Sequence, residues 1–188
     1  EYANKRGKLV GLIRITAETL SGIPSIVYGL FGMLFFTKTL KMGYSMMSGA
    51  CTLAIMILPL IMRTAEEALK SVPDSYREAS FGLGAGKLRT IFKIVLPAAV
   101  PGILSGVILA TGRIVGETAA LIYTAGSVAK IPSSVFSSGR TLAVHMYLLA
   151  NEGLHVNQAY ATAVILLILV IAINALSSFI AKKITKAQ

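Results

Sequence analysis

Four long apolar stretches constrain the fold of this chain more than any other feature of its sequence. An α-helix that rises 1.5 Å per residue needs about 20 apolar residues to cross a hydrocarbon core of about 30 Å. The hydrophobic content is 55% and the mean hydropathy is +0.73, which excludes an ordinary soluble domain. Because lipid cannot satisfy backbone polar groups, we expect an all-α polytopic membrane protein whose four transmembrane helices span about residues 20–37, 45–63, 95–123 and 158–181.

The distribution of positive charge predicts the orientation of these helices. Twelve of the 18 Lys and Arg residues lie before the first stretch, between the second and third, or after the fourth. The positive-inside rule therefore places both termini of this chain and the middle loop, about residues 64–94, in the cytoplasm. The net charge of +10 is thus explained by topology, and no nucleic-acid partner is expected. The chain starts with Glu1 and has no signal-peptide pattern, so we expect the sequence to begin within a longer protein.

The outer loop, about residues 124–157, shows no pattern of a metal or cofactor site. His145 and His155 lie ten residues apart without nearby cysteines or paired acids, which is poor spacing for metal ligation and favours a solvated loop. The single cysteine, Cys51, excludes an intrachain disulfide. The mildly amphipathic run over residues 141–150 predicts a short interfacial helix. We therefore expect no metal and no cofactor.

The middle loop is predicted to form a helix, a turn and a second helix. Ser75 and Glu78 fit a capping box, in which the Ser side chain accepts from a backbone N–H of the first turn and the Glu side chain accepts from the N–H of the cap residue. A helix should therefore begin at Ser75. The glycine-rich segment 82–86 should end that helix. Apolar residues at helical spacing then predict a second helix over residues 87–96, lying flat on the membrane surface before Pro97 turns the chain. Periodicity alone does not distinguish a connector from a docking surface.

A motif at fixed spacing in the middle loop favours the docking surface. The pattern Glu78-Ala79-Ser80, Gly84 and Ile94-Val95-Leu96-Pro97 resembles the signature loop of binding-protein-dependent ABC importer permeases, in which the third position is commonly Ala. The resemblance implies that the loop sits in a cleft on a cytoplasmic ATPase dimer and carries its closing motion to the spanning helices. It also implies coupling roles for Glu78, Ala79, Ser80 and Gly84.

Three further segments extend the resemblance to nearly the whole chain. They are similar to phosphate importer permeases, and more to the PstA-like subunit than to its PstC-like partner: Leu20–Gly32, Ile55–Pro59 ending in Arg63, and Arg113–Ala119. Such permeases have six spans, so residues 1–188 are expected to form a single permease domain that lacks the first two. The resemblance implies three protein partners, namely the ATPase, a PstC-like permease and an extracytoplasmic phosphate-binding protein. It also implies a location in the cytoplasmic membrane of a prokaryote.

Arg113 and Glu117 are the clearest charged residues at membrane depth. Such groups cost about 2.5–3.5 kcal/mol there and usually face a cavity, a partner or a pathway. The two residues can pair at i and i+4, which fits either a structural ion pair or a pathway. Arg63 can reach the lipid headgroups or converge with Arg113, where planar guanidinium groups suit phosphate oxygens. In the resembling family, arginines at these two positions are implicated in phosphate passage. We therefore expect Arg63, Arg113 and Glu117 to line the pathway, with Glu117 holding Arg113 in place.

Two pairs of glycines in the third apolar stretch predict that another helix packs closely against it. Gly102 with Gly106, and Gly112 with Gly116, have the GxxxG spacing that lets helix backbones approach each other in lipid. The second pair flanks Arg113. The charged face is therefore expected beside a tightly packed seam.

The resemblance implies the permease subunit of an ATP-driven phosphate importer that is not itself an enzyme. The chain has no G-x-x-x-x-G-K-[ST] motif, so ATP hydrolysis would belong to a partner. Permeases for sulfate, molybdate or phosphonate remain alternatives, because selectivity would rest largely on the binding protein. An anion channel or a membrane scaffold would use the middle loop only as a connector. An intramembrane enzyme is disfavoured, since neither HExxH nor GxSxG occurs.

Overall fold

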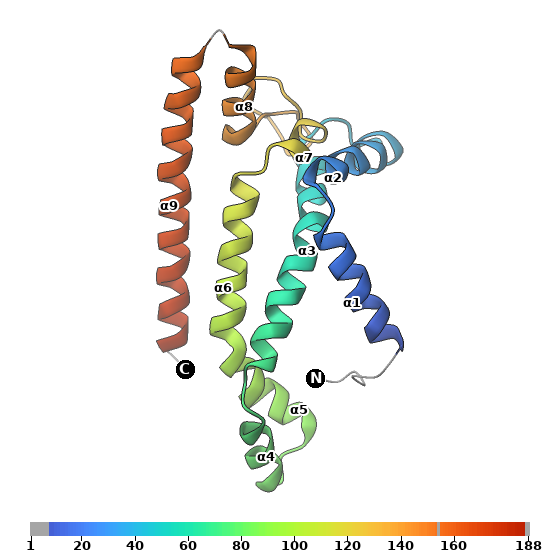
Figure 1. The fold of residues 1–188 in the computed structure, drawn as a ribbon, viewed down its shortest axis with the longest axis vertical. Coiled ribbons are helices and arrows are strands. Elements are labelled where there is room, and N and C mark those ends of the chain that lie inside the picture. Colours follow the sequence, from blue (N-terminus) through green and yellow to red (C-terminus); the bar gives the residue numbers. More distant parts are fainter. Residues whose placement is uncertain (1–7, 154, 187–188) are drawn as a thin grey trace. The chain divides into compact units, whose positions relative to one another are not determined.

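The computed structural model describes residues 8–153 and 155–186, and every regular element within those ranges is a helix (Figure 1). This confirms the predicted all-α fold. The elements in chain order are α1 (Lys8–Ser21), α2 (Ser25–Gly32), η1 (Met33–Thr39), α3 (Met46–Lys70), α4 (Asp74–Gly82), α5 (Lys87–Thr90), η2 (Ile91–Val95), α6 (Leu96–Val115), α7 (Ala119–Ile122), α8 (Leu142–Glu152) and α9 (Val156–Lys186).

Three helices of the described chain are long and apolar enough to cross a membrane, namely Met46–Lys70, Lys87–Val115 and Val156–Lys183. A fourth span results if α1 is taken together with α2 and η1, which are separated by a bent break. The apolar run predicts one helix over residues 20–37, but the structure breaks this segment between Ser21 and Ser25. Pro24 occupies the N-cap position of α2 with ψ 143°, and an extended proline there cannot continue the preceding helix.

The third apolar stretch lies on one continuous helix from Lys87 to Val115, formed by α5, η2 and α6. No separate surface helix ends at Pro97, contrary to the prediction, and the helix stops well before residue 123. The π-helical turn η2 ends two residues before Pro97. We attribute the continuity to this turn, because a widened turn accommodates a backbone whose α-helical hydrogen bonds are interrupted by proline.

The short helix predicted in the outer loop is confirmed as α8. Its N-cap is Thr141, whose Oγ1 accepts a hydrogen bond from the backbone N–H of Val144 at 3.4 Å. Gly153 ends the helix in the left-handed conformation, with φ 69°. A hydroxyl cap at the start and a glycine at the end are the usual local signals for a helix of this length.

The chain forms two compact units, and each has its own packing. The first consists of the described residues within Glu1–Ser21, Pro59–Ala110 and Ala175–Gln188. There α6 packs closely on α3, because Gly102 and Gly106 present no side chain to Ala68 and Thr64. A Cβ on Gly102 would lie 2.7 Å from the Cβ of Ala68. The close helix contact predicted for the first glycine pair is therefore present.

The second unit consists of Gly22–Leu58 and Thr111–Asn174. Its α2 packs on α7, where a Cβ on Gly29 would come within 2.8 Å of the Cα of Ala120. The unit also buries hydroxyl groups, and those of Thr37 and Ser48 lie 2.8 Å apart. These groups are hydrogen-bonded, which removes the cost of burying them.

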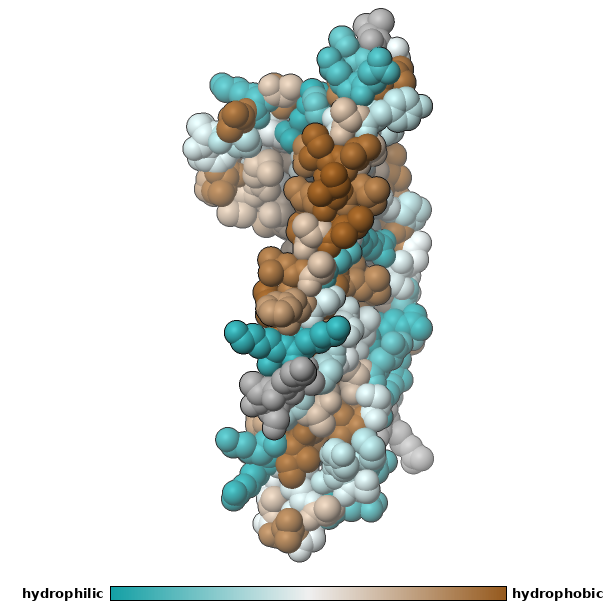
Figure 2. Space-filling model, turned by 90° about the vertical axis from the view of Figure 1, so that its left-hand side faces the viewer, coloured by the Kyte–Doolittle hydropathy of each residue, from teal (hydrophilic) through white to brown (hydrophobic). Residues whose placement is uncertain are grey.

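The apolar side chains of α9 are largely exposed. Figure 2 shows them gathered along the face of this helix that is turned to the viewer. An exposed apolar surface of this kind is expected where a helix faces lipid or another spanning helix. The exposed large hydrophobic residues of this helix are Val156, Tyr160, Val164, Ile165, Leu167, Ile168, Leu169, Ile171, Leu176, Phe179 and Ile180.

Candidate functional site

The predicted first helix and turn of the middle loop are present within the first unit, and the turn leads into α5 and η2, which begin the long helix that ends at Val115. We call residues 73–95 the elbow (Figure 1). Its first helix, α4, begins at Asp74 with Pro73 as N-cap and has no side-chain cap. The predicted capping box from Ser75 to Glu78 is therefore wrong. The extended Pro73 ends the preceding segment and its carbonyl oxygen accepts from the N–H of Tyr76 at 3.1 Å, so Ser75 already lies inside the first turn.

The turn of the elbow depends on Gly84. Its φ is +80°, a conformation that favours glycine over every residue with a side chain. The N–H of Gly84 donates to the carbonyl oxygen of Phe81 at 2.9 Å, and that of Ala85 donates to Ser80 at 3.1 Å. These bonds use carbonyl groups that the end of α4 leaves without helical partners, so the chain can reverse and begin α5 at Lys87.

The predicted coupling residues do not share one environment. Glu78 and Ala79 are exposed on α4, and Gly84 is exposed in the turn. Ser80, however, is only 3% exposed, and its hydroxyl lies 2.8 Å from that of the equally buried Thr90. Ser80 therefore holds the two halves of the elbow together instead of facing outward.

Two contacts fix the elbow to the end of α3. An apolar cluster joins Val72 and Ala68 to Val95 and Ala99, and Val95 is completely buried. The guanidinium group of Arg77 donates to the backbone carbonyls of Leu69 and Val72. Sequence reasoning missed both Arg77 and Thr90. Pro73 could have pointed to the role of Arg77, because a proline after a helix leaves backbone carbonyl groups without a donor, and a nearby arginine can bond to them.

Arg63 lies near the end of α3 and pairs with Glu67 on the same helix. Its Nε is 3.0 Å from Glu67 Oε1, and both side chains are more than 60% exposed. One helical turn away, Glu66 bonds to Lys70 at 2.6 Å and to Arg14 of α1. This face of α3 therefore carries both positive and negative side chains. Breaking the pair between Arg63 and Glu67 costs little, since exposed ion pairs are weak.

Arg113 and Glu117 are not joined in the way the sequence predicts. Arg113 is exposed in the last turn of α6, which ends at Val115, and Glu117 lies in the following non-helical segment. Within the described residues they form no ion pair. Instead, Glu117 Oε1 accepts a hydrogen bond from the N–H of Ala120 at 3.2 Å, in the first turn of α7. Gly116 interrupts the helix on which an i, i+4 pair would have depended.

The second predicted glycine pair is only partly used for packing. A Cβ on Gly112 would lie 3.7 Å from Asn174 Oδ1 on α9, which is ordinary contact, and Gly116 lies just beyond the end of α6.

Arg63 belongs to the first unit and Arg113 to the second. Their convergence on one pathway therefore stays a prediction.

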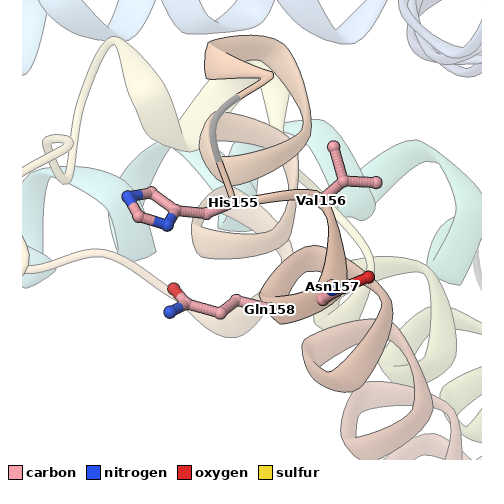
Figure 3. A pocket seen from close by; sticks show the side chains of 4 residues that line it. All are labelled: His155, Val156, Asn157 and Gln158. Atoms are coloured by element: carbon pink, nitrogen blue, oxygen red, sulfur yellow. The ribbon is translucent and has the colours of Figure 1, made fainter.

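The two histidines have different surroundings. His145 is half-buried on α8, so the solvated-loop prediction is wrong for this residue. His155 is exposed and lines a hollow at the start of α9 together with Val156, Asn157 and Gln158. Figure 3 shows the side chains of His155 and Gln158 pointing to the same side and that of Asn157 pointing away. Among the described residues, no three His, Cys, Asp or Glu side chains are grouped to hold a metal ion.

Comparison with known proteins identifies relatives over nearly the whole chain. The model of the binding-protein-dependent transport system inner membrane component matches residues 2–187. The probable ABC transporter permease protein YqgI of Bacillus subtilis is 38% identical in a 167-residue alignment that covers 82% of this chain and 56% of that protein. The phosphate transport system permease protein PstA 1 of Mycobacterium tuberculosis is 36% identical over 177 residues, 93% of this chain and 58% of that protein.

A PstA homolog of Mycoplasma pneumoniae is 35% identical over 87% of this chain and 26% of its own length. The chain thus spans a little more than half the length of the first two relatives and about a quarter of the length of the third. Among solved structures, an inward-facing MetNI methionine ABC transporter has a chain that superposes with a TM-score of 0.78 at 22% identity, covering 98% of this chain and 78% of that one. At this identity the likeness concerns the fold.

Proposed function

The chain belongs to the family of binding-protein-dependent transport system inner membrane components, and we propose that it is a membrane subunit of an ATP-driven phosphate importer. The observation that carries the proposal is the identity of 35–36% with proteins named as phosphate transport permeases, over 87–93% of this chain. Its partners would be an ATPase dimer, a PstC-like permease and an extracytoplasmic phosphate-binding protein.

The elbow supports the proposed ATPase docking. Glu78 and Ala79 are exposed on α4 and Gly84 in the adjoining turn, so a partner can reach all three positions of the family motif. The elbow is also fixed to α3 by Arg77 and by the cluster around Val95. A force applied to the exposed face would therefore reach a helix long enough to cross the membrane.

The distribution of charge supports a cytoplasmic elbow and a multi-pass location in a prokaryotic cytoplasmic membrane. Thirteen of the 18 Lys and Arg residues belong to the sequence segments of the first unit, and five to those of the second. The elbow, α1 and the end of α9 all lie in the first unit. A cationic unit that contains α1, the elbow and the end of α9 is what the positive-inside rule predicts for the cytoplasmic side.

We propose that phosphate passes Arg63 and Arg113. Both side chains are exposed in this single chain, so a neighbouring subunit or a passing anion can reach them. A guanidinium group can donate two parallel hydrogen bonds to phosphate oxygens, and exposed pairing with Glu67 is weak enough to exchange for that ligand. Glu117 would act by fixing the backbone turn after Arg113 and by keeping a negative charge near that arginine, so that the anion is not held too tightly to leave.

The test is phosphate uptake by membrane vesicles that contain the full-length permease, its partner permease and the ATPase, supplied with the binding protein. We expect uptake of radiolabelled phosphate that requires ATP inside and that excess unlabelled phosphate abolishes. Competition by sulfate, molybdate or phosphonate at equal concentration would assign one of those anions instead. Uptake without ATP would indicate a channel and contradict the proposal.

The ATPase arm of the proposal is tested with Glu78→Lys. Charge reversal on the docking face should prevent recruitment of the ATPase, since like charges or an unpaired buried charge at an interface cost several kcal/mol. Glu152→Lys, at the end of α8 in the second unit, is the matched control and should leave recruitment unchanged. Equal recovery of the ATPase with both variants would remove Glu78 from the docking face.

A further inference from the structure

Arg77 joins the elbow to the end of α3 through directional hydrogen bonds. Its Nη1 donates to the carbonyl oxygen of Val72 at 2.8 Å, and its Nη2 donates to that of Leu69 at 3.1 Å. Nη1 also lies 3.2 Å from Oδ1 of Asp74, with which it forms an ion pair. The side chain of Arg77 is only 16% exposed, although most of α4 is exposed. This arginine therefore faces the membrane helix and not the surface of the elbow.

Pro73 explains why the end of α3 needs donors from elsewhere. In a continuing α-helix the carbonyl oxygen of Leu69 would accept from the N–H of residue 73, but proline has none. The N–H of Tyr76, which would serve Val72 in the same way, donates to Pro73 instead. Arg77 supplies donors to both carbonyls, at the end of α3 where the helix dipole is negative and a cation is favoured.

We infer that Arg77 is a positioning residue that transmits movement of the docked elbow to α3. The inference rests on the proposed function, which assigns the ATPase contact to the exposed residues Glu78 and Ala79 directly after it. The apolar cluster around Val95 also holds the elbow to the end of α3, but apolar contacts have no preferred direction and permit the two parts to slide past each other. A planar guanidinium on two carbonyls fixes both distance and angle, so a displacement of α4 displaces the end of α3.

The distinguishing measurement is the amount of phosphate imported per ATP hydrolysed by the assembled importer. Arg77→Met keeps the unbranched apolar stem of the side chain but removes the donors, and Arg77→Lys keeps the charge but not the planar pair of N–H donors. Arg89→Met, on an exposed residue of α5, is the matched control. We expect Arg77→Met to keep ATPase recruitment and hydrolysis while the transport ratio falls about fivefold or more, with Arg77→Lys intermediate and Arg89→Met unchanged.

Three outcomes would overturn the inference. The first is an unchanged transport ratio in Arg77→Met, or in Arg77→Lys if Arg77→Met does not assemble. The second is a parallel fall of hydrolysis and transport, which would place Arg77 in ATPase recruitment and not in transmission. The third is a fall in the ratio that is equally large in Arg89→Met, because any lost positive charge would then suffice.

A second readout does not depend on the substrate. Spin labels at Met62 on α3 and Leu83 at the end of α4, both exposed, report the distance between the elbow and α3 in a Cys51→Ala background. We expect one narrow distance distribution in the complex and a broad one with Arg77→Met. Equal distributions would refute the positioning role. If the wild-type complex imports no phosphate but the distributions differ, the proposed substrate fails while the inference on Arg77 holds.

Discussion

Ser80 and Thr90 hydrogen-bond to each other through hydroxyl groups 2.8 Å apart, and this bond closes the inner side of the elbow. Both residues are at most 3% exposed. Thr90 also donates to the carbonyl oxygen of Gly86 at 3.2 Å, so it keeps a partner without Ser80. The shape of the elbow therefore depends on a polar contact between its two helices as well as on apolar packing.

Replacing Ser80 with Ala should loosen the elbow without altering its exposed face. We expect local opening to become easier by about 1 kcal/mol, the usual net value of one hydrogen bond, and ATPase recruitment to persist. Hydrogen exchange of elbow peptides in the complex would measure the change, with the exposed Ser75→Ala as control. Loss of the ATPase from Ser80→Ala would contradict the structure, because it would return Ser80 to the docking surface.

Two glycines of the elbow should respond differently to replacement by alanine. Neither Gly84 nor Gly82 would meet another atom within 4 Å if it carried a Cβ, but Gly84 has φ +80° and Gly82 ends α4 without a positive φ. Gly84→Ala should therefore cost about 1–2 kcal/mol through backbone strain, whereas Gly82→Ala should be neutral or slightly stabilising. Thermal unfolding of both variants in detergent checks this expectation. Equal effects would show that the turn does not need the left-handed conformation.

Gly106 and Gly112 provide a matched pair for the packing of α6. A Cβ on Gly106 would lie 2.6 Å from the Cβ of Thr64, whereas one on Gly112 would lie 3.7 Å from Asn174 Oδ1. We expect Gly106→Ala to separate α3 from α6 and to cost about 1–3 kcal/mol, as overpacking does, and Gly112→Ala to have little effect. The yield and melting temperature of the purified subunit would report the difference. A stable Gly106→Ala variant would mean that the two helices approach less closely than described.

Arg113 should matter for transport more than its exposure suggests. In the proposed pathway, Arg113→Gln would remove charge-assisted hydrogen bonds to the anion and should lower phosphate uptake about tenfold at unchanged ATPase recruitment. Lys130→Gln, at an exposed residue of the segment between α7 and α8, removes an equal charge and should transport normally. The comparison is made by initial uptake rates at several external phosphate concentrations. Wild-type rates for Arg113→Gln would remove this residue from the pathway.

Local sequence patterns were sufficient to predict those parts of the structure that depend on residues close together in the chain. Apolar runs of membrane length predicted α3, the helix containing α6, and α9, because the cost of exposing backbone groups to lipid leaves few alternatives. The mildly amphipathic run over residues 141–150 predicted α8. The spacing of Glu78, Gly84 and Pro97 placed the chain in its family before any contact was known, since the motif encodes a turn and an exposed face within one short segment.

Other features depended on residues far apart in the chain, and only the tertiary structure decided them. Ser80 fits a docking motif as well as a core position, and its burial follows from Thr90, ten residues later. Glu117 has the right spacing to pair with Arg113, but the end of α6 turns it toward Ala120. The sequence by itself determined which segments leave water and which remain in it, because transfer free energy is set residue by residue. Which polar groups meet each other was decided by the path of the backbone, because a hydrogen bond exists only at the right distance and angle.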